Sequence, residues 1–574
     1  MSNLSEASSN SPKTSSKPLE LPGSPRALNI LFWALAIALL FCRLGNSAPW
    51  QSEDRWLEVA REMLLSGDYF SPTINGTIYF DKPLLSYWLV LVATAATGGL
   101  SELAMRAPSA LSALAALWIT IDLGRRLWSE QVGRLAGWIL LTCFGFLQWG
   151  RLGEADMANL AATIAAVGWY WRRRDTPSFS GYLGFYLIIA VGAQLKGLTA
   201  VVVPLLALLP DMLTNRRWRL HINVAHLLAA LIAATVYFLP FMFAASHSAS
   251  HAVAATQPSG LGLVVRENIV RYFAPFDHTE PIYTYLIAIP QYTFPWSPIV
   301  VAALIAGCRE KFRSENNVRW VLYALALIFL FFSLSGSRRN YYILPILPYC
   351  VLLSARYLSD LKFPRLRRLA ISLSIALLIA VGLLQAALPL LQSLLQQRLG
   401  ATLPHETMLL CAAIGSMSLC FLGGLYWWHR RQRGAAVVAI VGSATVLWAG
   451  FFFVQLLVLD RYRTEAPFAR ALKPLAASVA AADTAMYRER PIGRLLYYSD
   501  VRLPVLQLNN AAELQKFIET PPYPKLVLVA TKYQRELPES LRNRAPDLVE
   551  QQHAWEKKAD DKLSAWRIAA KDGS

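Results

Sequence analysis

Charged residues are scarce in this 574-residue chain, making up 16% of it, while 55% of the residues are hydrophobic. Soluble proteins carry about a quarter charged residues, so this composition excludes a soluble protein and predicts an integral membrane protein. Lys and Arg outnumber Asp and Glu by 55 to 37, which gives a formal net charge of +18. These cations form short clusters between long apolar runs, as membrane topology requires, so we do not expect nucleic acid as a partner.

Cysteine pairs, a signal peptide and internal repeats are also lacking. The six cysteines include no CxxC pair, which excludes a disulfide framework and zinc-finger spacing. Without a repeat, the sequence lacks the inverted-repeat signature of many secondary transporters. The first 26 residues are too polar for a signal-peptide core. We therefore expect a disordered cytoplasmic tail over 1–27 and an uncleaved membrane anchor over about 28–44.

Apolar runs that approach the length of a membrane span, about 20 residues, recur along the chain. Linkers rich in Arg and Lys alternate with poorer ones, and the positive-inside rule places the rich linkers in the cytoplasm. These rich linkers lie near residues 125, 173, 217, 311, 365 and 431. Counted from a cytoplasmic N-terminus, these linkers fall in the cytoplasm only if the run 84–99 does not cross. We therefore interpret 84–99 as a juxtamembrane or re-entrant element, which leaves about thirteen true spans.

The chain divides into a membrane part over 28–460 and a C-terminal part over 461–574. The latter alternates short apolar segments, such as 525–530, with polar stretches typical of helices. This pattern predicts a small soluble α/β domain. Charge parity places that domain outside the membrane, together with two long outer loops, 45–106 and 246–280.

The first outer loop contains an expected amphipathic helix, with apolar residues at 56, 59, 60, 63 and 64. The acidic pair Glu53 and Asp54 opens it. Negative charge at a helix N-terminus is favourable by itself, so this pair alone does not indicate a site.

Other ionisable residues gather on the same outer side. They are Asp81, Lys82, Arg151, Glu154, Asp156, Lys196, Arg266, Glu267, Arg271, Asp277, His278, Arg338 and Arg339. For any one of them, capping or snorkelling is the simpler explanation, but together they predict a polar cavity that faces outward. Lys and Arg can bind a phosphate, carboxylates with a His can bind a divalent metal, and a spare carboxylate can act as a general base. A lipid-borne phosphate would reach such a site laterally from the bilayer.

The motifs in this loop resemble those of a known family. The run from Arg55 to Asp68, followed by Tyr79-Phe80-Asp81-Lys82-Pro83, is similar to the first outer loop of the bacterial aminoarabinose (4-amino-4-deoxy-L-arabinose) lipid A transferases. Those enzymes belong to the GT-C superfamily, with the protein O-mannosyltransferases. The similarity covers roughly 28–360 and continues through Asp156-Met157, Leu195-Lys196-Gly197, Asp277-His278, Phe331–Gly336 and Tyr342–Pro345.

The resemblance implies a GT-C fold with thirteen spans, an outer catalytic cavity, a periplasmic C-terminal domain, a polyprenyl (undecaprenyl) phosphate sugar donor and inverting transfer. It also implies a divalent metal, Zn, Mg or Mn, held by Asp81 and His278, where the family usually has Glu instead of Asp beside the Lys. The donor phosphate would face Lys82, Lys196, Arg338 and Arg339. Asp156, also a catalytic residue, would orient the substrate or a neighbouring cation, and Arg55, Arg151 and Tyr342 would position the substrate.

The family's usual order in the first loop is Asp-Glu, one residue, Arg, Tyr, whereas this chain has Ser52-Glu53-Asp54-Arg55-Trp56. Either the leading acid has become Ser52, or Glu53 and Asp54 replace the pair with a shift of one residue. The general base is therefore assigned to Glu53 or Asp54. These departures also weaken the expectation that the sugar is aminoarabinose itself.

The leading hypothesis is a bacterial inner-membrane glycosyltransferase that moves a sugar from a polyprenyl phosphate to a lipid A-like lipid or a glycan on the periplasmic face. Three alternatives stay open. A protein O-mannosyltransferase-like enzyme would act on Ser or Thr, a flippase or transporter would move a lipid-linked sugar, and a scaffold would have no activity. The sequence does not identify the sugar or the acceptor, and its only other expected partners are membrane lipids.

Overall fold

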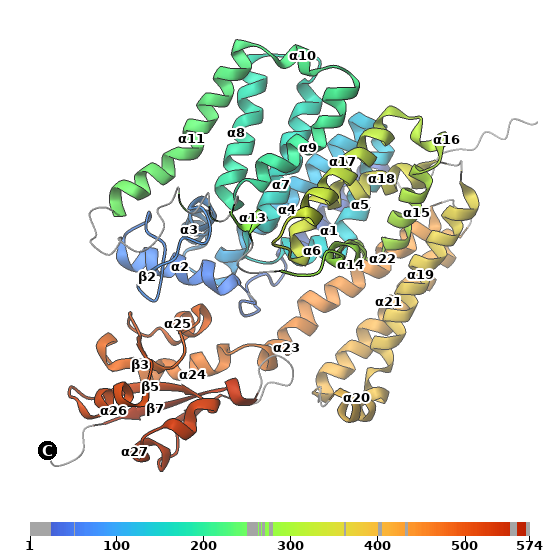
Figure 1. Cartoon of the computed structure of the whole chain (residues 1–574). Coiled ribbons are helices and arrows are strands. Elements are labelled where there is room, and N and C mark those ends of the chain that lie inside the picture. The colour runs from blue at the N-terminus through green and yellow to red at the C-terminus, as the bar shows by residue number, and fades with distance from the viewer. Residues whose placement is uncertain are drawn as a thin grey trace, which may run out of the picture.

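The computed structural model describes residues 24–50, 52–248, 262, 266, 270–274, 279–360, 363–399, 404–430, 434–550 and 559–569. A bundle of long α-helices forms the membrane part, and a small sheet domain lies beyond one end of the bundle (Figure 1). The predicted class, a polytopic helical membrane protein with a small C-terminal α/β domain, is confirmed.

The first half of the membrane part contains α1 (Pro25–Phe41), α2 (Glu53–Ser66), the hairpin of β1 (Thr73–Ile74) and β2 (Thr77–Ile78), α3 (Leu85–Thr97), α4 (Glu102–Leu127), α5 (Glu130–Thr142), α6 (Phe144–Gly150), α7 (Ala155–Arg173), α8 (Phe179–Lys196), α9 (Thr199–Thr214), α10 (Trp218–His221) and α11 (Val224–Ser248). The second half contains α13 (Arg271–Phe273), α14 (Thr284–Thr293), α15 (Ser297–Gly307), α16 (Glu310–Arg313), α17 (Asn316–Leu334), a 3-10 helix (Asn340–Ile346), α18 (Leu347–Ser359), α19 (Pro364–Ala387), α20 (Gln392–Leu399), α21 (His405–His429), α22 (Ala435–Gly450) and α23 (Leu456–Arg463).

Eight helices of the described chain are long and apolar enough to cross a membrane, or ten if each of two bent helix pairs counts as one span. Three further expected spans coincide with α1, α7 and α9, of which α1 and α9 are apolar but shorter. Each expected span therefore coincides with a helix or a bent pair, while the count of thirteen stays a prediction.

The run 84–99, expected not to cross, forms the 13-residue helix α3. At about 1.5 Å per residue, such a helix spans about 20 Å, which is less than the roughly 30 Å of a bilayer core. It packs against α2, α4 and α8, so it belongs to the end of the bundle that carries α2.

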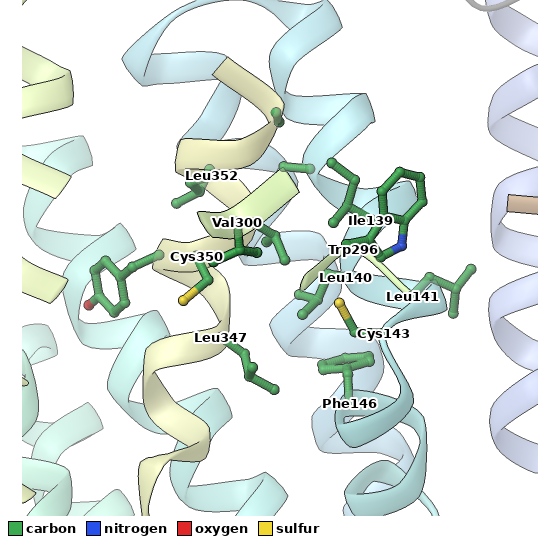
Figure 2. Close-up of a cluster of buried hydrophobic side chains, with 14 of the residues drawn as sticks. Ile139, Leu140, Leu141, Cys143, Phe146, Trp296, Val300, Leu347, Cys350 and Leu352 are labelled. Carbon is green, nitrogen blue, oxygen red and sulfur yellow. The ribbon is translucent and has the colours of Figure 1, made fainter. Parts of the chain in front are cut away.

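The core of the bundle lies where the two bent helix pairs meet. Figure 2 shows Cys143, Trp296 and Cys350 among Leu, Ile, Val and Phe side chains, all of them buried. The Phe144 amide donates a hydrogen bond to the Phe294 carbonyl at 2.9 Å, and the Trp296 indole donates to Thr142 Oγ1 at 2.9 Å. Polar groups that lie at the two bends thus form hydrogen bonds with one another.

The C-terminal domain is a five-stranded mixed sheet in the order β4-β3-β5-β7-β6. Its strands are β3 (Thr484–Tyr487), β4 (Leu506–Leu508), β5 (Lys525–Ala530), β6 (Leu548–Val549) and β7 (Leu563–Ile568), and its helices include α24 (Ala466–Ala476), α25 (Gly493–Ser499), α26 (Ala511–Glu519) and α27 (Glu539–Arg542). β3 pairs in parallel with β4 and β5, while β7 is antiparallel to both of its neighbours.

This domain docks on the first outer loop through α25, which packs on α2. Arg494 donates a hydrogen bond to the Pro49 carbonyl at 3.0 Å. The Asn75 side chain donates to the Val505 carbonyl at 2.9 Å and accepts from the Val505 amide at 2.7 Å. The C-terminal domain therefore holds the loop that carries α2.

Candidate functional site

A cavity of about 550 Å³ opens at the end of the bundle that carries α2, between the start of α2, the loop before α3, the start of α7, the end of α8 and the segment 335–342. Because α7 runs from Ala155 beside this cavity to Arg173 in an Arg-rich linker, the cavity lies at the end opposite that linker. Its polar and apolar walls are formed in part by Arg55, Trp56, Asp81, Lys82, Glu154, Asp156, Lys196, Arg271, Phe331, Phe332, Arg339, Tyr341 and Tyr342.

On one side of the cavity, Asp81 lies between two cations. Lys82 Nζ is 2.8 Å and Arg55 Nη1 is 3.7 Å from Asp81 Oδ2. Arg55 also donates a hydrogen bond to the Tyr79 hydroxyl at 2.9 Å. Burial alone would raise the pKa of Asp81, but Lys82, Arg55 and Arg271 outweigh it and hold the pKa below its usual value. Asp81 is therefore ionised and fixes both cations at the cavity wall.

On the other side, Asp156 at the start of α7 accepts a hydrogen bond from Lys196 at the end of α8. The Lys196 ammonium also lies 5.2 Å and 5.1 Å from the ring centres of Tyr341 and Tyr342. The helix ends at this lysine because Gly197, with a φ of 103°, adopts a backbone conformation that other residues disfavour. A turn thus presents the lysine to the cavity.

The balance of charge in the cavity is positive. Five cationic side chains line it, Arg55, Lys82, Lys196, Arg271 and Arg339, against three carboxyl groups. Within the part of the chain that the structure describes, Arg339 has no carboxylate partner, and its guanidinium lies 5.9 Å from the Tyr341 ring centre. Cations beside a wall of Trp and Phe suit a ligand that joins a phosphate to a hydrocarbon chain.

Glu154 is a cavity residue that the sequence places on the outer side without a role in the site. It lies in the turn before α7 and is 7% exposed, and no described side chain makes a hydrogen bond or an ion pair with its carboxyl group. Burial first, and then the negative charges of Asp156 and Glu53, raise its pKa above the usual value, although Lys196 and Lys82 oppose the shift. Of the three carboxyl groups that line the cavity in the described residues, Glu154 is thus the one that is free to hold or release a proton.

Glu53, one of two candidates for the base, lies outside the cavity lining and is 0% exposed. Its carboxylate accepts hydrogen bonds from Arg106 Nε at 2.7 Å, Arg106 Nη2 at 2.8 Å, the Gly153 amide at 2.6 Å and the Trp50 amide at 2.7 Å. Because these four donors occupy both oxygens, Glu53 holds the first loop against α4 and against the turn that carries Glu154.

Three further predicted residues also lie outside the cavity lining. Asp54, the other candidate base, is buried under α25 and accepts a hydrogen bond from the Arg494 amide at 3.3 Å. Arg151 donates to the carbonyls of Leu39 at 2.7 Å and Cys42 at 3.0 Å, at the end of α1. Arg338 donates to the Glu280 carbonyl at 2.7 Å. In each case the hydrogen bonds are with the backbone, and they fasten loops around the site.

The predicted metal site is only partly described, because His278 lies outside the described residues. Asp81, its other predicted ligand, is paired with Lys82 and Arg55. Among the residues that the structure describes, no three His, Cys, Asp or Glu side chains cluster as a metal site would require. Asp81 is the one predicted ligand that the structure describes, and we assign no step to a metal. The metal stays a prediction, tested by the metal content of the purified wild type, Asp81→Asn and His278→Ala proteins.

Of the predicted residues, the structure brings Arg55, Asp81, Lys82, Asp156, Lys196, Arg339 and Tyr342 together around one cavity. Glu154, Arg271 and Tyr341, to which the sequence analysis assigned no role, join them there. Glu154 and Tyr341 stand within two residues of Asp156, Arg339 and Tyr342, and Arg271 stands in the outer segment that leads to His278; their place in the outer turns was the available signal.

Comparisons with known proteins point to one group of enzymes. A family model described as dolichyl-phosphate-mannose-protein mannosyltransferase matches residues 81–243. The chain is 28% identical over 339 residues to the undecaprenyl phosphate-alpha-4-amino-4-deoxy-L-arabinose arabinosyl transferase 1 of Pseudomonas fluorescens (strain Pf0-1), a match that covers 56% of this chain and 57% of that protein. It is 29% identical over 411 residues to the transferase of the same name, without the number, from Pseudomonas aeruginosa (strain LESB58), covering 68% of this chain and 70% of that protein. The chain thus spans less than two thirds of the first of these relatives.

The comparison with solved structures agrees with the comparison of sequences. The crystal structure of ArnT from Cupriavidus metallidurans bound to undecaprenyl phosphate superposes with a TM-score of 0.73, at 19% identity, over 95% of this chain and 99% of that one. The same protein in the apo state gives a TM-score of 0.70. The comparisons therefore confirm the resemblance that the motifs predict, to the bacterial undecaprenyl phosphate aminoarabinose transferases and their GT-C relatives.

Proposed function

We propose that this protein is a membrane glycosyltransferase that moves a sugar from a polyprenyl phosphate, such as undecaprenyl phosphate, to a lipid A-like lipid or a glycan at the outer face of the membrane. The names of the relatives make aminoarabinose the first sugar to test. Because the Cupriavidus protein was crystallised with undecaprenyl phosphate bound, that lipid is the first donor carrier to test.

The observation that carries this proposal is the cavity with five cationic side chains beside an aromatic wall. Lys82 and Lys196 approach it from two different segments, and each is held in place by one aspartate. A phosphate bound between them would be neutralised as it departs, and such electrostatic stabilisation typically contributes more to catalysis than any other single effect. The aromatic wall would accept the first part of the polyprenyl chain.

The transfer itself exchanges one bond for another. The bond between the anomeric carbon and the donor phosphate oxygen breaks, and the polyprenyl phosphate leaves with the electron pair. The acceptor oxygen forms the new bond to that carbon from the opposite face. If the acceptor is a hydroxyl group, its proton must go to a base, and the geometry favours Glu154 for this role over Glu53, whose oxygens are occupied. A phosphate acceptor needs no base.

The first experiment compares lipid A, other envelope glycans and periplasmic proteins by mass spectrometry in cells with and without the gene. We expect one sugar to be missing from a lipid or glycan in the deletion strain. Complementation with Lys82→Met or Lys196→Met should fail to restore it, because each change removes a cavity cation. Lys311→Met removes a cation at the opposite end and serves as the matched control. Full restoration by both cavity variants would contradict the proposal.

A protein acceptor is the second candidate, because the matching family model is described as a protein mannosyltransferase. Sugar lost only from periplasmic proteins would favour this candidate. Unchanged glycans, with a lipid-linked sugar redistributed across the membrane, would favour a flippase instead.

A further inference from the structure

A second cavity, of about 220 Å³, lies at the end of the bundle opposite the candidate site. It is enclosed by the ends of α7 and α9 and the starts of α8 and α11, and its walls are largely aromatic, with Trp169, Tyr182, Phe185 and Tyr186. These helix ends surround α10, at the end of the bundle remote from the C-terminal sheet (Figure 1). We call it the aromatic cavity.

A smaller polar cavity of about 200 Å³ adjoins the aromatic cavity and shares the Arg174 side chain with it. The polar cavity is also lined by Arg217, Arg319 and Asp211. The Arg174 side chain thus lies between the aromatic cavity and the polar cavity and lines both of them.

The cations around these two cavities outnumber the acids. Arg174 and Arg217 share two carboxylates, Asp211 at 3.4 Å each and Asp175 at 3.5 Å and 2.5 Å, so the four arginines of the two cavities face two acids. Among the described residues, neither Arg173 nor Arg319 meets a carboxylate. Arg173 stacks on Trp169 at 4.9 Å from the ring centre, and Arg319 donates a hydrogen bond to Asn316 at 2.7 Å. The site as it stands carries excess positive charge that an anion would neutralise.

We propose that the two cavities together bind one acidic phospholipid of the surrounding bilayer. Its phosphate contacts Arg174, with Arg173 and Arg319 on either side, and one acyl chain enters the aromatic cavity. Basic pockets between membrane helices are known to recognise anionic head groups, and the rings supply the apolar contact that a free anion would not need. Charge complementarity selects an acidic over a zwitterionic lipid. This inference does not depend on the proposed transferase activity.

Native mass spectrometry of the purified full-length protein tests this inference. The probes are dioleoyl phosphatidylglycerol, dioleoyl phosphatidylcholine and inorganic phosphate. We expect one phosphatidylglycerol to stay bound under conditions that remove phosphatidylcholine, and phosphate not to displace it. In the double variant Arg173→Gln/Arg319→Gln, retention should fall at least tenfold. Arg126→Gln removes a cation at the same end that lines neither cavity, so its retention should match the wild type.

A second variant tests the acyl-chain part of the site. Leu209→Trp adds bulk to the wall of the aromatic cavity and leaves every arginine in place, so it should also reduce retention. Melting temperatures of all variants show whether they fold. Equal retention in the wild type and the folded double variant would overturn the inference, as would equal retention of phosphatidylcholine. Displacement by phosphate would indicate an anion site without lipid selectivity and would overturn it too.

Discussion

At the scale of single residues, the ion pair of Glu53 and Arg106 is removed from water on both sides, with side chains 0% and 2% exposed. Arg106→Met would leave the Glu53 charge buried without its partner, which costs about 3–5 kcal/mol. We expect a clear fall in the melting temperature of the purified protein in detergent, and partial recovery in Glu53→Leu/Arg106→Met. Arg126→Met, which breaks an exposed pair with Asp122, should cost at most about 1 kcal/mol. Equal melting temperatures for the two single variants would contradict a structural role for Glu53.

Glu154 gives the cavity a pH dependence. Burial, Asp156 and Glu53 raise its pKa above 4.5, and a base must be ionised before it accepts a proton. Transfer to a hydroxyl acceptor should therefore increase as the pH rises through the raised pKa and then level off. In Glu154→Gln we expect this increase to disappear and the rate to fall by about 10²–10⁴-fold. Initial rates of the purified enzyme between mildly acidic and alkaline pH provide the measurement.

The raised pKa of Glu154 also affects the stability of the fold. This effect distinguishes the contribution of Glu154 to stability from its role as the base. Because the folded-state pKa is raised, the stability that the protonated group provides is complete below the unfolded pKa, near 4.5, and is lost as the pH rises through the folded pKa. Glu154→Gln should therefore raise the melting temperature at alkaline pH while it lowers activity. Identical pH profiles of rate in the wild type and the variant would exclude Glu154 as the base.

Residue types and their outer location predict much of the candidate site. Lys82, Lys196 and Asp156 line the cavity as expected, because the charged turns on one side of the membrane part meet at the same end of the bundle. The environment of Glu53 was not predictable, because its donors Arg106 and Gly153 lie 53 and 100 residues away. Local sequence spacing carries no information about partners at that distance.

At the scale of elements, helix α25 meets α2 at Gly493. A Cβ atom on this residue would lie 2.6 Å from the Asp54 carbonyl oxygen, so Gly493→Val must push the two helices apart. We expect faster hydrogen exchange in α2 and α25 and earlier proteolytic release of the C-terminal domain. In Gly423→Val the added group meets open space, so exchange in α2 and α25 should stay unchanged. Equal exchange in the two variants would mean that α25 does not fix α2.

The bent helix pairs show what apolar runs leave undetermined about elements. The runs 132–149 and 281–307 have the length of single spans, yet the structure bends them by 68° and 117°. Pro295, which has no amide hydrogen to donate, stands at the second break. The first break, at Cys143, is joined to the second by the hydrogen bond that the Phe144 amide donates to the Phe294 carbonyl. A bend that depends on a partner 150 residues away leaves no trace in local hydropathy.

At the scale of the whole molecule, the helices separate two chemically different ends. The candidate site and the C-terminal sheet lie toward one end, and the linker around α10 lies at the other (Figure 1). Since short linkers rich in Arg stay in the cytoplasm, the sheet domain should face the periplasm. We expect a membrane-impermeant maleimide to label Arg535→Cys, an exposed residue of that domain, in cells with a permeabilised outer membrane.

The control is Arg219→Cys, which is exposed on α10 and should be labelled only after the inner membrane is opened. The native cysteines are replaced by serine or alanine in both variants, because Cys42, Cys308 and Cys420 are exposed. Labelling of Arg219→Cys in place of Arg535→Cys would reverse the orientation. The cavity would then face the cytoplasm, and a transfer to an acceptor on the periplasmic face would be impossible. The orientation of the molecule is therefore a condition for the proposed reaction that can be tested without knowing the sugar.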